Sequence, residues 1–124
     1  MAVSIENNVS LKSYNTFGID VLAKHFAVFE NTDQLAELLE DAIYKNANPF
    51  VLGGGSNVLL TKNVDRPVLL NRIKGIELVS EDESHYYVKA NAGEVWHEFV
   101  MDCIKNNYAG VENLSLIPGN VGAS

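Results

Sequence analysis

Apolar residues recur at helical spacing in the segment 31–46, "NTDQLAELLEDAIYKN". Leucine and isoleucine fall three or four residues apart, as on one face of an amphipathic helix, so we predict a helix there. Asn31 or Thr32 can cap its start, and Asn31 with Gln34 fits a capping box. Lys45 suits the negative end of the helix dipole, and the following "NANP" ends the helix.

A second amphipathic helix is predicted over 94–107, in "EVWHEFVMDCIKNN". Its apolar stripe is formed by Trp96, Phe99, Val100, Cys103 and Ile104. Because Cys103 lies in this stripe, we interpret it as a packed thiol and not as a nucleophile. His97 lies beside the stripe, and we interpret it as exposed or edge-packed and not as catalytic.

Short apolar runs predict strands around these helices. The runs are 25–29, 50–52, 58–60, 67–71, 76–80 and 86–91. The last two flank the acidic run Glu81 to Glu83 and are expected to form a hairpin. A strand, helix, strand unit therefore leads the chain into three successive glycines.

Two loops rich in glycine are the strongest candidates for a ligand site. They are "LGGGSN" at 52–57 and "IPGNVG" at 117–122. The first lacks the Gly-Lys-Ser/Thr of a P-loop, and "VLL" after it does not open a helix as a Rossmann fingerprint would. Successive N–H groups in such a loop can instead form a nest for an anion. Both interpretations stay open here: two tight turns, or two surfaces that converge on one long dinucleotide.

Composition narrows the choice of partners. The chain has 124 residues, the size of one domain, and a net charge of −7, which argues against nucleic acid or an anionic membrane. A single cysteine excludes an intrachain disulfide, and we see no signal peptide, so we expect a cytoplasmic setting. The three histidines show no metal-ligand spacing, so no metal site is predicted.

Four of the nine basic residues follow the first glycine loop. These are Lys62, Arg66, Arg72 and Lys74. They are either solvated surface residues or a cationic rim beside an anion site. The chain also stops at Ser124 inside the second glycine-containing loop, so we expect a fragment of a longer protein.

Five motifs resemble those of the UDP-N-acetylenolpyruvoylglucosamine reductases, also called UDP-N-acetylmuramate dehydrogenases, in the family's order and approximate spacing. They are "NTFGID" (15–20), "LGGGSNVLL" (52–60), "NRIKGIE" (71–77), "AGEVWHEFV" (92–100) and "GVENLSLIPGNVGAS" (110–124). The resemblance implies the N-terminal part of an α+β fold of the vanillyl-alcohol-oxidase type, with FAD between two subdomains. It places the first subdomain at 1–70 and the incomplete second one at 71–124.

The resemblance also implies which residues contact the cofactor. "LGGGSN" would lie against the FAD diphosphate, and "IPGNVGAS" would run along the other side of the cofactor toward the flavin ring. The implied cofactor-binding residues are Leu52, Gly53, Gly54, Gly55, Ser56, Asn57, Val58, Ile117, Pro118, Gly119, Val121, Gly122 and Ser124.

In the reductase family, as the resemblance implies, NADPH reduces FAD and hydride then passes to the enolpyruvyl group of a UDP-sugar. A serine protonates the product, and an arginine and a glutamate stabilise the intermediate. No residue of this chain matches these catalytic groups, which in the family lie C-terminal to the motifs seen here. We therefore expect the chain alone to show no turnover, to bind FAD weakly or not at all, and to expose surface that favours self-association. The alternatives are another flavoenzyme of the same fold and a non-catalytic interaction module.

Overall fold

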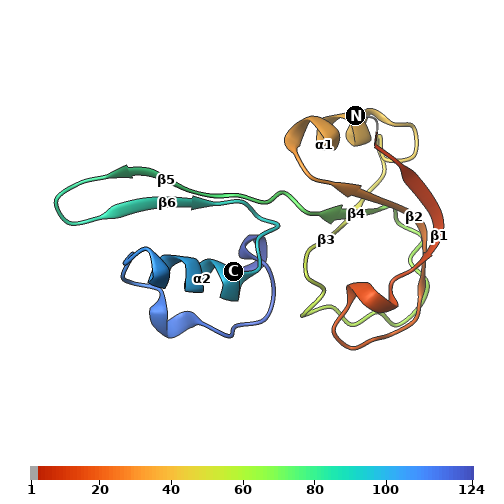
Figure 1. Ribbon diagram of the computed structural model, residues 1–124. Helices are drawn as coiled ribbons and strands as arrows, with labels where there is room; N and C mark the ends of the chain where they lie inside the picture. Colours follow the sequence, from red (N-terminus) through yellow and green to blue (C-terminus); the bar gives the residue numbers. More distant parts are fainter. Residues whose placement is uncertain (1–2) are drawn as a thin grey trace.

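The computed structural model describes residues 3–124, which form two lobes joined by a short linker (Figure 1). The first lobe, residues 3–71, holds strands β1 (Ile5–Ser10), β2 (Leu22–Phe29), β3 (Phe50–Leu52) and β4 (Val68–Asn71). The second lobe, residues 76–124, holds the hairpin of β5 (Ile76–Glu81) and β6 (Tyr86–Ala90) and helix α2 (Trp96–Lys105). The hairpin lies beside the helix (Figure 1). The linker is the segment 72–75.

The sheet of the first lobe has the strand order β1-β2-β4-β3. β2 is antiparallel to β1 and parallel to β4, and β3 is also parallel to β4. Phe26, Val68 and Phe50 therefore form one row across three strands. Helix α1 (Thr32–Glu40) connects β2 to β3, so β4 enters between two strands that precede it in the chain.

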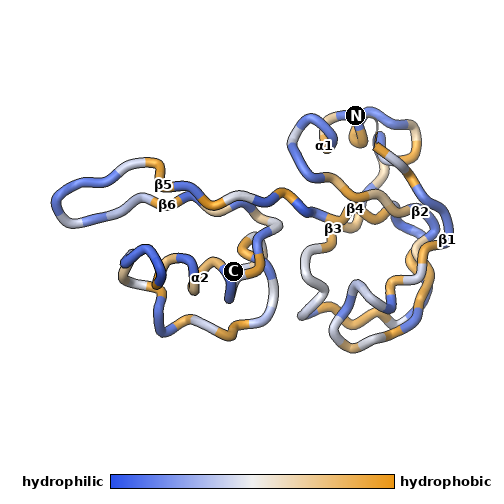
Figure 2. The backbone as a smooth tube through the Cα atoms, in the orientation of Figure 1, coloured by the Kyte–Doolittle hydropathy of each residue, from blue (hydrophilic) through white to orange (hydrophobic). Residues whose placement is uncertain are grey.

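Both faces of this sheet are covered, which explains why β4 is a continuous apolar run. Val68, Leu69 and Leu70 are all buried, and their side chains alternate between the faces. One face packs on Leu11, Val21, Ala23, Phe26, Leu52 and Leu60, and the other on Ala27, Phe29, Leu38 and Tyr44. Figure 2 shows the hydrophobic residues along β2, β3 and β4, whereas the turn between β5 and β6 is hydrophilic.

The predicted strands and helices are largely confirmed, with corrections at their ends. β3 and β4 lie within the predicted runs, and the hairpin forms with one irregularity between Leu78 and Ser80. The run 58–60 is not a strand, so that prediction was wrong. β1 and the short 3-10 helix at Lys12–Tyr14 were not predicted.

Helix α1 is shorter than predicted. Asn31 caps it, because its side chain accepts a hydrogen bond from the Gln34 N–H at 2.8 Å. The Gln34 side chain in turn accepts the N–H of Glu30, the residue before the cap, so the arrangement differs from the predicted capping box by one residue in its second hydrogen bond. The helix ends at Glu40 because Asp41 is extended, so Lys45 lies in the turns beyond it and not in its last turn.

The second lobe buries few side chains. Val100 and Cys103 of α2 are buried, whereas Leu78, Val79, Tyr86 and Tyr87 of the hairpin are exposed. Two further 3-10 helices follow α2, at Glu112–Leu114 and Val121–Ala123. Among residues 3–124, no helix combines the length and the apolar character needed to cross a membrane.

Tyr44 gives the first lobe a measurable dependence on pH. Its side chain is 2% exposed, its hydroxyl donates to the Val68 carbonyl at 2.8 Å, and burial raises its pKa from 10.0 to about 12. Because the folded pKa is the higher one, this contribution to stability is complete below pH 10 and is lost as the pH rises to about 12.

We expect Tyr44→Phe to remove this loss. Between pH 9 and pH 12 the free energy of unfolding of the unsubstituted chain should fall by about 2 kcal/mol more than that of the variant. Urea unfolding followed by circular dichroism at each pH measures the difference. Parallel pH curves for the two chains would contradict the prediction.

Candidate functional site

The first glycine loop, residues 53–57, leaves the end of β3 and is fixed against the segment before β2. The Thr16 N–H donates to the Gly55 carbonyl at 3.0 Å, and Gly55 has a φ of 67°. A Cβ on Gly55 would overlap the Tyr14 carbonyl oxygen and lie 2.8 Å from the Cα of Asn15. Only glycine therefore allows this approach of two backbones.

The conformation of this loop leaves a row of backbone donors available. Within residues 3–124, the N–H groups of Gly53, Gly54 and Gly55 donate no hydrogen bond to the chain. Unpaired backbone donors are uncommon away from solvent or a ligand, and successive ones form an anion-binding concavity. The arrangement is chemically suited to oxygen atoms of a phosphate or diphosphate.

The second glycine loop, residues 117–122, is held along the segment that leads into α2. The backbone N–H of Trp96 donates to the Gly119 carbonyl at 3.0 Å. The N–H groups of Val121 and Gly122 donate to the carbonyls of Glu94 and Ala92, at 2.8 and 3.1 Å. These two donors are therefore paired within the chain, whereas the N–H groups of Gly119 and Asn120 donate to no group of residues 3–124.

The two loops meet between the lobes. A Cβ on Gly54 would lie 3.5 Å from the Cα of Gly119 and 3.2 Å from the Oδ1 atom of Asn120. A cavity of about 230 Å³ adjoins this contact. It is lined by Ser13, Tyr14, Gly53, Gly54, Leu70, Asn71, Arg72, Lys74, Gly93, Val95 and Asn120.

The predicted site residues divide into those at this junction and those beyond it. Gly53 and Gly54 line the cavity; Leu52 and Gly122 line a smaller adjoining one of about 190 Å³. Ser56 lies opposite Gly119, since a Cβ on Gly119 would come within 2.8 Å of the Ser56 Oγ atom. The lining of neither cavity includes Gly55, Asn57, Val58, Ile117, Pro118, Val121 or Ser124.

Sequence reasoning missed Tyr14 and Asn120 as cavity residues. Asn120 lies between two residues of the second loop that were named, and its side chain is the group of that loop nearest to Gly53 and Gly54. The only signal for Asn120 in the sequence was an amide side chain between Gly119 and Gly122. Tyr14 carried none, because its place depends on how the segment before β2 folds onto the first loop.

The four basic residues after the first loop separate into two pairs. Arg72 and Lys74 line the cavity beside the first glycine loop, as a cationic rim would require. Lys62 and Arg66 line a different hollow. There Arg66 donates to the carbonyls of Asn48 and Pro49, at 2.8 and 2.9 Å.

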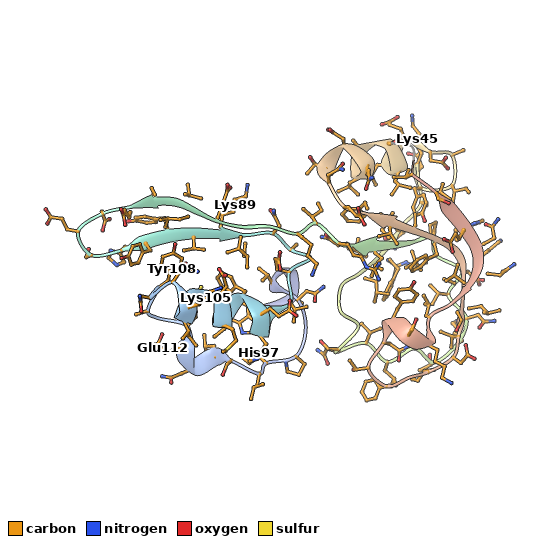
Figure 3. All side chains as sticks on the ribbon, viewed as in Figure 1. Lys45, Lys89, His97, Lys105, Tyr108 and Glu112 are labelled. Carbon is orange, nitrogen blue, oxygen red and sulfur yellow. The ribbon has the colours of Figure 1, made fainter. Side chains whose placement is uncertain are left out.

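Other candidate groups have structural explanations. Cys103 is 3% exposed and burial raises the pKa of its thiol, which confirms the packed thiol. The Nδ1 atom of His97 accepts a hydrogen bond from the Leu116 N–H at 3.0 Å. His97 therefore lies on the side of α2 that faces the segment before the second glycine loop (Figure 3). Hydrogen bonds from the backbone of Ser84, the hydroxyl of Tyr87 and the backbone of His85 lower the pKa of the exposed Asp82 carboxyl in the hairpin turn.

Residues 23–124 match the family described as "FAD binding domain". This chain belongs to the FAD-binding domain family. The match includes β2 to β4, both glycine loops and the whole second lobe, so it spans the cavity described above. The predicted α+β FAD-binding fold and the predicted cofactor, FAD, are thereby confirmed for this member of the family.

Relatives of this FAD-binding domain carry the name UDP-N-acetylenolpyruvoylglucosamine reductase. The protein of Flavobacterium johnsoniae is 48% identical over 122 residues, which are 98% of this chain and 36% of the relative. The Pseudomonas putida protein is 45% identical over 124 residues, 100% of this chain and 37% of the relative. The chain thus spans little more than a third of these relatives, and its resemblance to the reductases is confirmed.

A solved structure agrees with these sequence comparisons. The crystal structure of UDP-N-acetylenolpyruvylglucosamine reductase from Thermus caldophilus superposes with a TM-score of 0.66 at 27% sequence identity. The match covers 98% of this chain and 40% of that one.

Proposed function

We propose that these residues form the part of a flavin reductase that holds FAD. The reductase would use NADPH to reduce the enolpyruvyl group of UDP-N-acetylglucosamine enolpyruvate, in the synthesis of peptidoglycan precursors. The names of the relatives support this substrate class. One observation carries the cofactor site: three successive N–H groups, of Gly53, Gly54 and Gly55, have no acceptor among residues 3–124, and the first two of these glycines line the cavity where the loops meet.

In this proposal the first loop and the second loop hold opposite sides of FAD. Gly53, Gly54, Gly55 and Ser56 would receive the diphosphate through N–H groups and a hydroxyl. When bound, FAD would supply the hydride chemistry of the reaction. The other proposed contacts along the two loops are Leu52, Asn57, Val58, Ile117, Pro118, Gly119, Val121, Gly122 and Ser124.

We further propose that the chain comprises a first FAD-binding subdomain, 1–70, and the beginning of a second, 71–124. The end of β4 at Asn71 and the start of β5 at Ile76 support a boundary between them. The residues that line the cavity are three glycines, two asparagines, a serine, a tyrosine, a leucine, a valine, an arginine and a lysine, and we assign none of them a catalytic role. NADPH and the UDP-sugar would engage other parts of a longer protein, in the bacterial cytoplasm.

The exposed apolar side chains of the second lobe support self-association of the isolated chain. Val79 is 61% exposed and Leu116 is 76% exposed. The strands β5 and β6 also form a two-stranded sheet, so each has an edge without a neighbour among residues 3–124.

We expect the 124-residue chain to show no turnover and to bind FAD weakly or not at all, whereas the full-length protein is yellow and active. The chain spans 36–37% of its relatives, so it lacks most of the surface that would enclose the cofactor and substrate. The test measures flavin absorbance and substrate-dependent NADPH oxidation of both proteins side by side.

Each result has a distinct consequence. Reduction of the enolpyruvyl substrate by the 124-residue chain would refute its inactivity, and a tight stoichiometric yellow complex would refute its weak binding. A full-length protein that binds FAD but oxidises NADPH at the same rate with and without the enolpyruvyl substrate would favour another flavoenzyme of this fold. A colourless full-length protein without affinity for FAD would favour the interaction module.

A further inference from the structure

Arg72 is a cation at the cavity whose guanidinium has no acceptor among residues 3–124. Its guanidinium lies 6.0 Å from the centroid of the Tyr14 ring, and both side chains line the cavity beside Gly53 and Gly54. Within residues 3–124, Arg72 makes no ion pair and its guanidinium donates no hydrogen bond. Glu30 lines a neighbouring hollow with Arg72 and Lys74, yet forms no ion pair with either.

The backbone that carries Arg72 is fixed from both lobes. Its N–H donates to the Phe29 carbonyl at the end of β2 at 2.9 Å. The next residue, Ile73, accepts the Gly93 N–H at 2.9 Å, and its own N–H donates to the Asn71 side chain at 3.0 Å. The position of the Arg72 backbone is therefore set where the two lobes join.

Arg66 provides the contrast within the same basic cluster. Its guanidinium donates to the Asn48 and Pro49 carbonyls and to the Asn48 side chain, and it lies over the Phe50 ring at 5.6 Å, so it is held by the protein. Arg72 has the same five donors in a planar fork, which matches a phosphate in two-point geometry, and it leaves them directed to solvent or to a ligand.

We propose that Arg72 determines cofactor specificity by pairing with the diphosphate, so that the site selects FAD over flavins that lack it. This inference rests on the proposed function, in which the cavity holds FAD. The N–H groups of the first loop supply partial charges, and Arg72 adds one full positive charge to them. Riboflavin has the same ring system without any phosphate, so its binding gains nothing from Arg72.

The test titrates the full-length apoprotein with FAD and with riboflavin and follows flavin fluorescence. We expect Arg72→Gln to weaken FAD binding about tenfold, the size of one charged contact in a partly hydrated site, and to change riboflavin binding less than about twofold. Arg72→Lys should fall between, because lysine keeps the charge and loses the fork. Lys62→Gln removes a positive charge outside the cavity and should change neither affinity.

The outcomes separate this inference from the proposed function. If the unsubstituted full-length protein binds neither flavin, the proposed function fails. If it binds FAD tightly while Arg72→Gln weakens both flavins equally, Arg72 only supports the fold and the inference is overturned. It is also overturned if Arg72→Gln leaves the preference for FAD over riboflavin unchanged, or if Lys62→Gln has the same effect as Arg72→Gln.

Discussion

Replacing Gly55 by alanine should lower the free energy of unfolding by about 3 kcal/mol or more. The added Cβ would overlap the carbonyl oxygen of Tyr14, and the distance to the Cα of Asn15 would be 2.8 Å. Both atoms belong to backbone, which cannot move aside as a flexible side chain can. The φ of 67° adds the strain of a left-handed conformation.

Gly18 provides the matched control for this substitution. Its φ is 66°, almost that of Gly55, but no heavy atom lies within 4 Å of the position of a Cβ. Gly18→Ala should therefore cost only the backbone strain, about 1 kcal/mol. Urea unfolding of the two variants by circular dichroism gives the difference, and equal losses would show that the contact with Tyr14 and Asn15 is not what requires glycine.

The Gly55 substitution should also affect the cofactor. The clash would push the first glycine loop away from Tyr14, and with it the N–H groups of Gly53 and Gly54 that we assign to the diphosphate. In the full-length protein, Gly55→Ala should therefore lose bound FAD during purification, whereas Gly18→Ala should retain it. Stoichiometric FAD in purified Gly55→Ala would contradict this part of the prediction.

Asn15→Ala should destabilise the chain by about 3 kcal/mol, because it removes three hydrogen bonds and leaves the N–H and the carbonyl of Ile19 without partners among residues 3–124. The Leu11 carbonyl still accepts the Tyr14 N–H at 3.0 Å. The Asn15 amide donates to the carbonyls of Leu11 and Ile19, at 2.7 and 3.0 Å, and its Oδ1 accepts the Ile19 N–H at 3.1 Å. The residue is 6% exposed, so water replaces these partners poorly. Thermal or urea unfolding measures the loss.

Two further variants sharpen the test of Asn15. Asn63 makes one exposed contact with the Leu22 N–H at 2.9 Å, so Asn63→Ala should cost less than about 1 kcal/mol. Asn15→Asp keeps the acceptor for Ile19 but presents a carboxylate to two carbonyls, so it should be no more stable than Asn15→Ala at neutral pH. A stable Asn15→Asp would mean that the two donated hydrogen bonds contribute little.

Much of the fold was predictable because burial on both sides of the sheet leaves a plain apolar signal. β4 reads as such a run, and all of its valine and leucine side chains are buried. β1 was missed because its sequence, "IENNVS", has only two apolar positions and is an edge strand with Asn8 at a φ of 55°. An exposed edge strand needs no apolar pattern, so periodicity alone does not find it.

Two errors arose from local chemistry that competes with the apolar pattern. The run 58–60 looks like a strand, and its burial alternates, with Leu60 in the core and Leu59 67% exposed, but the segment pairs with no strand. Beyond α1 the helical spacing continues, but the Asp41 side chain accepts the Ile43 N–H at 2.9 Å and ends the helix. Aspartate offers the backbone this alternative to helical hydrogen bonding.

The candidate site was predictable in part, for a related reason. Glycine spacing and the family resemblance located both loops, because glycine is required where backbones approach closely. The sequence suggested a cationic rim but did not show which basic residues form it. Arg72 and Arg66 look equivalent in sequence and differ only in the groups that surround them. The place of Asn120 depends on the packing of one lobe against the other, which no local pattern encodes.

The late arrival of β4 in the middle of the sheet has a consequence for the order of synthesis. β3 lies at one edge, with β4 as its only neighbour in the sheet formed by residues 3–124. A chain emerging from the ribosome therefore exposes β3 and the three glycines before Val68 exists to pair with Phe50. Until about twenty further residues have been made, β4 is missing beside the first glycine loop. A flavin that arrived earlier would meet only a flexible loop.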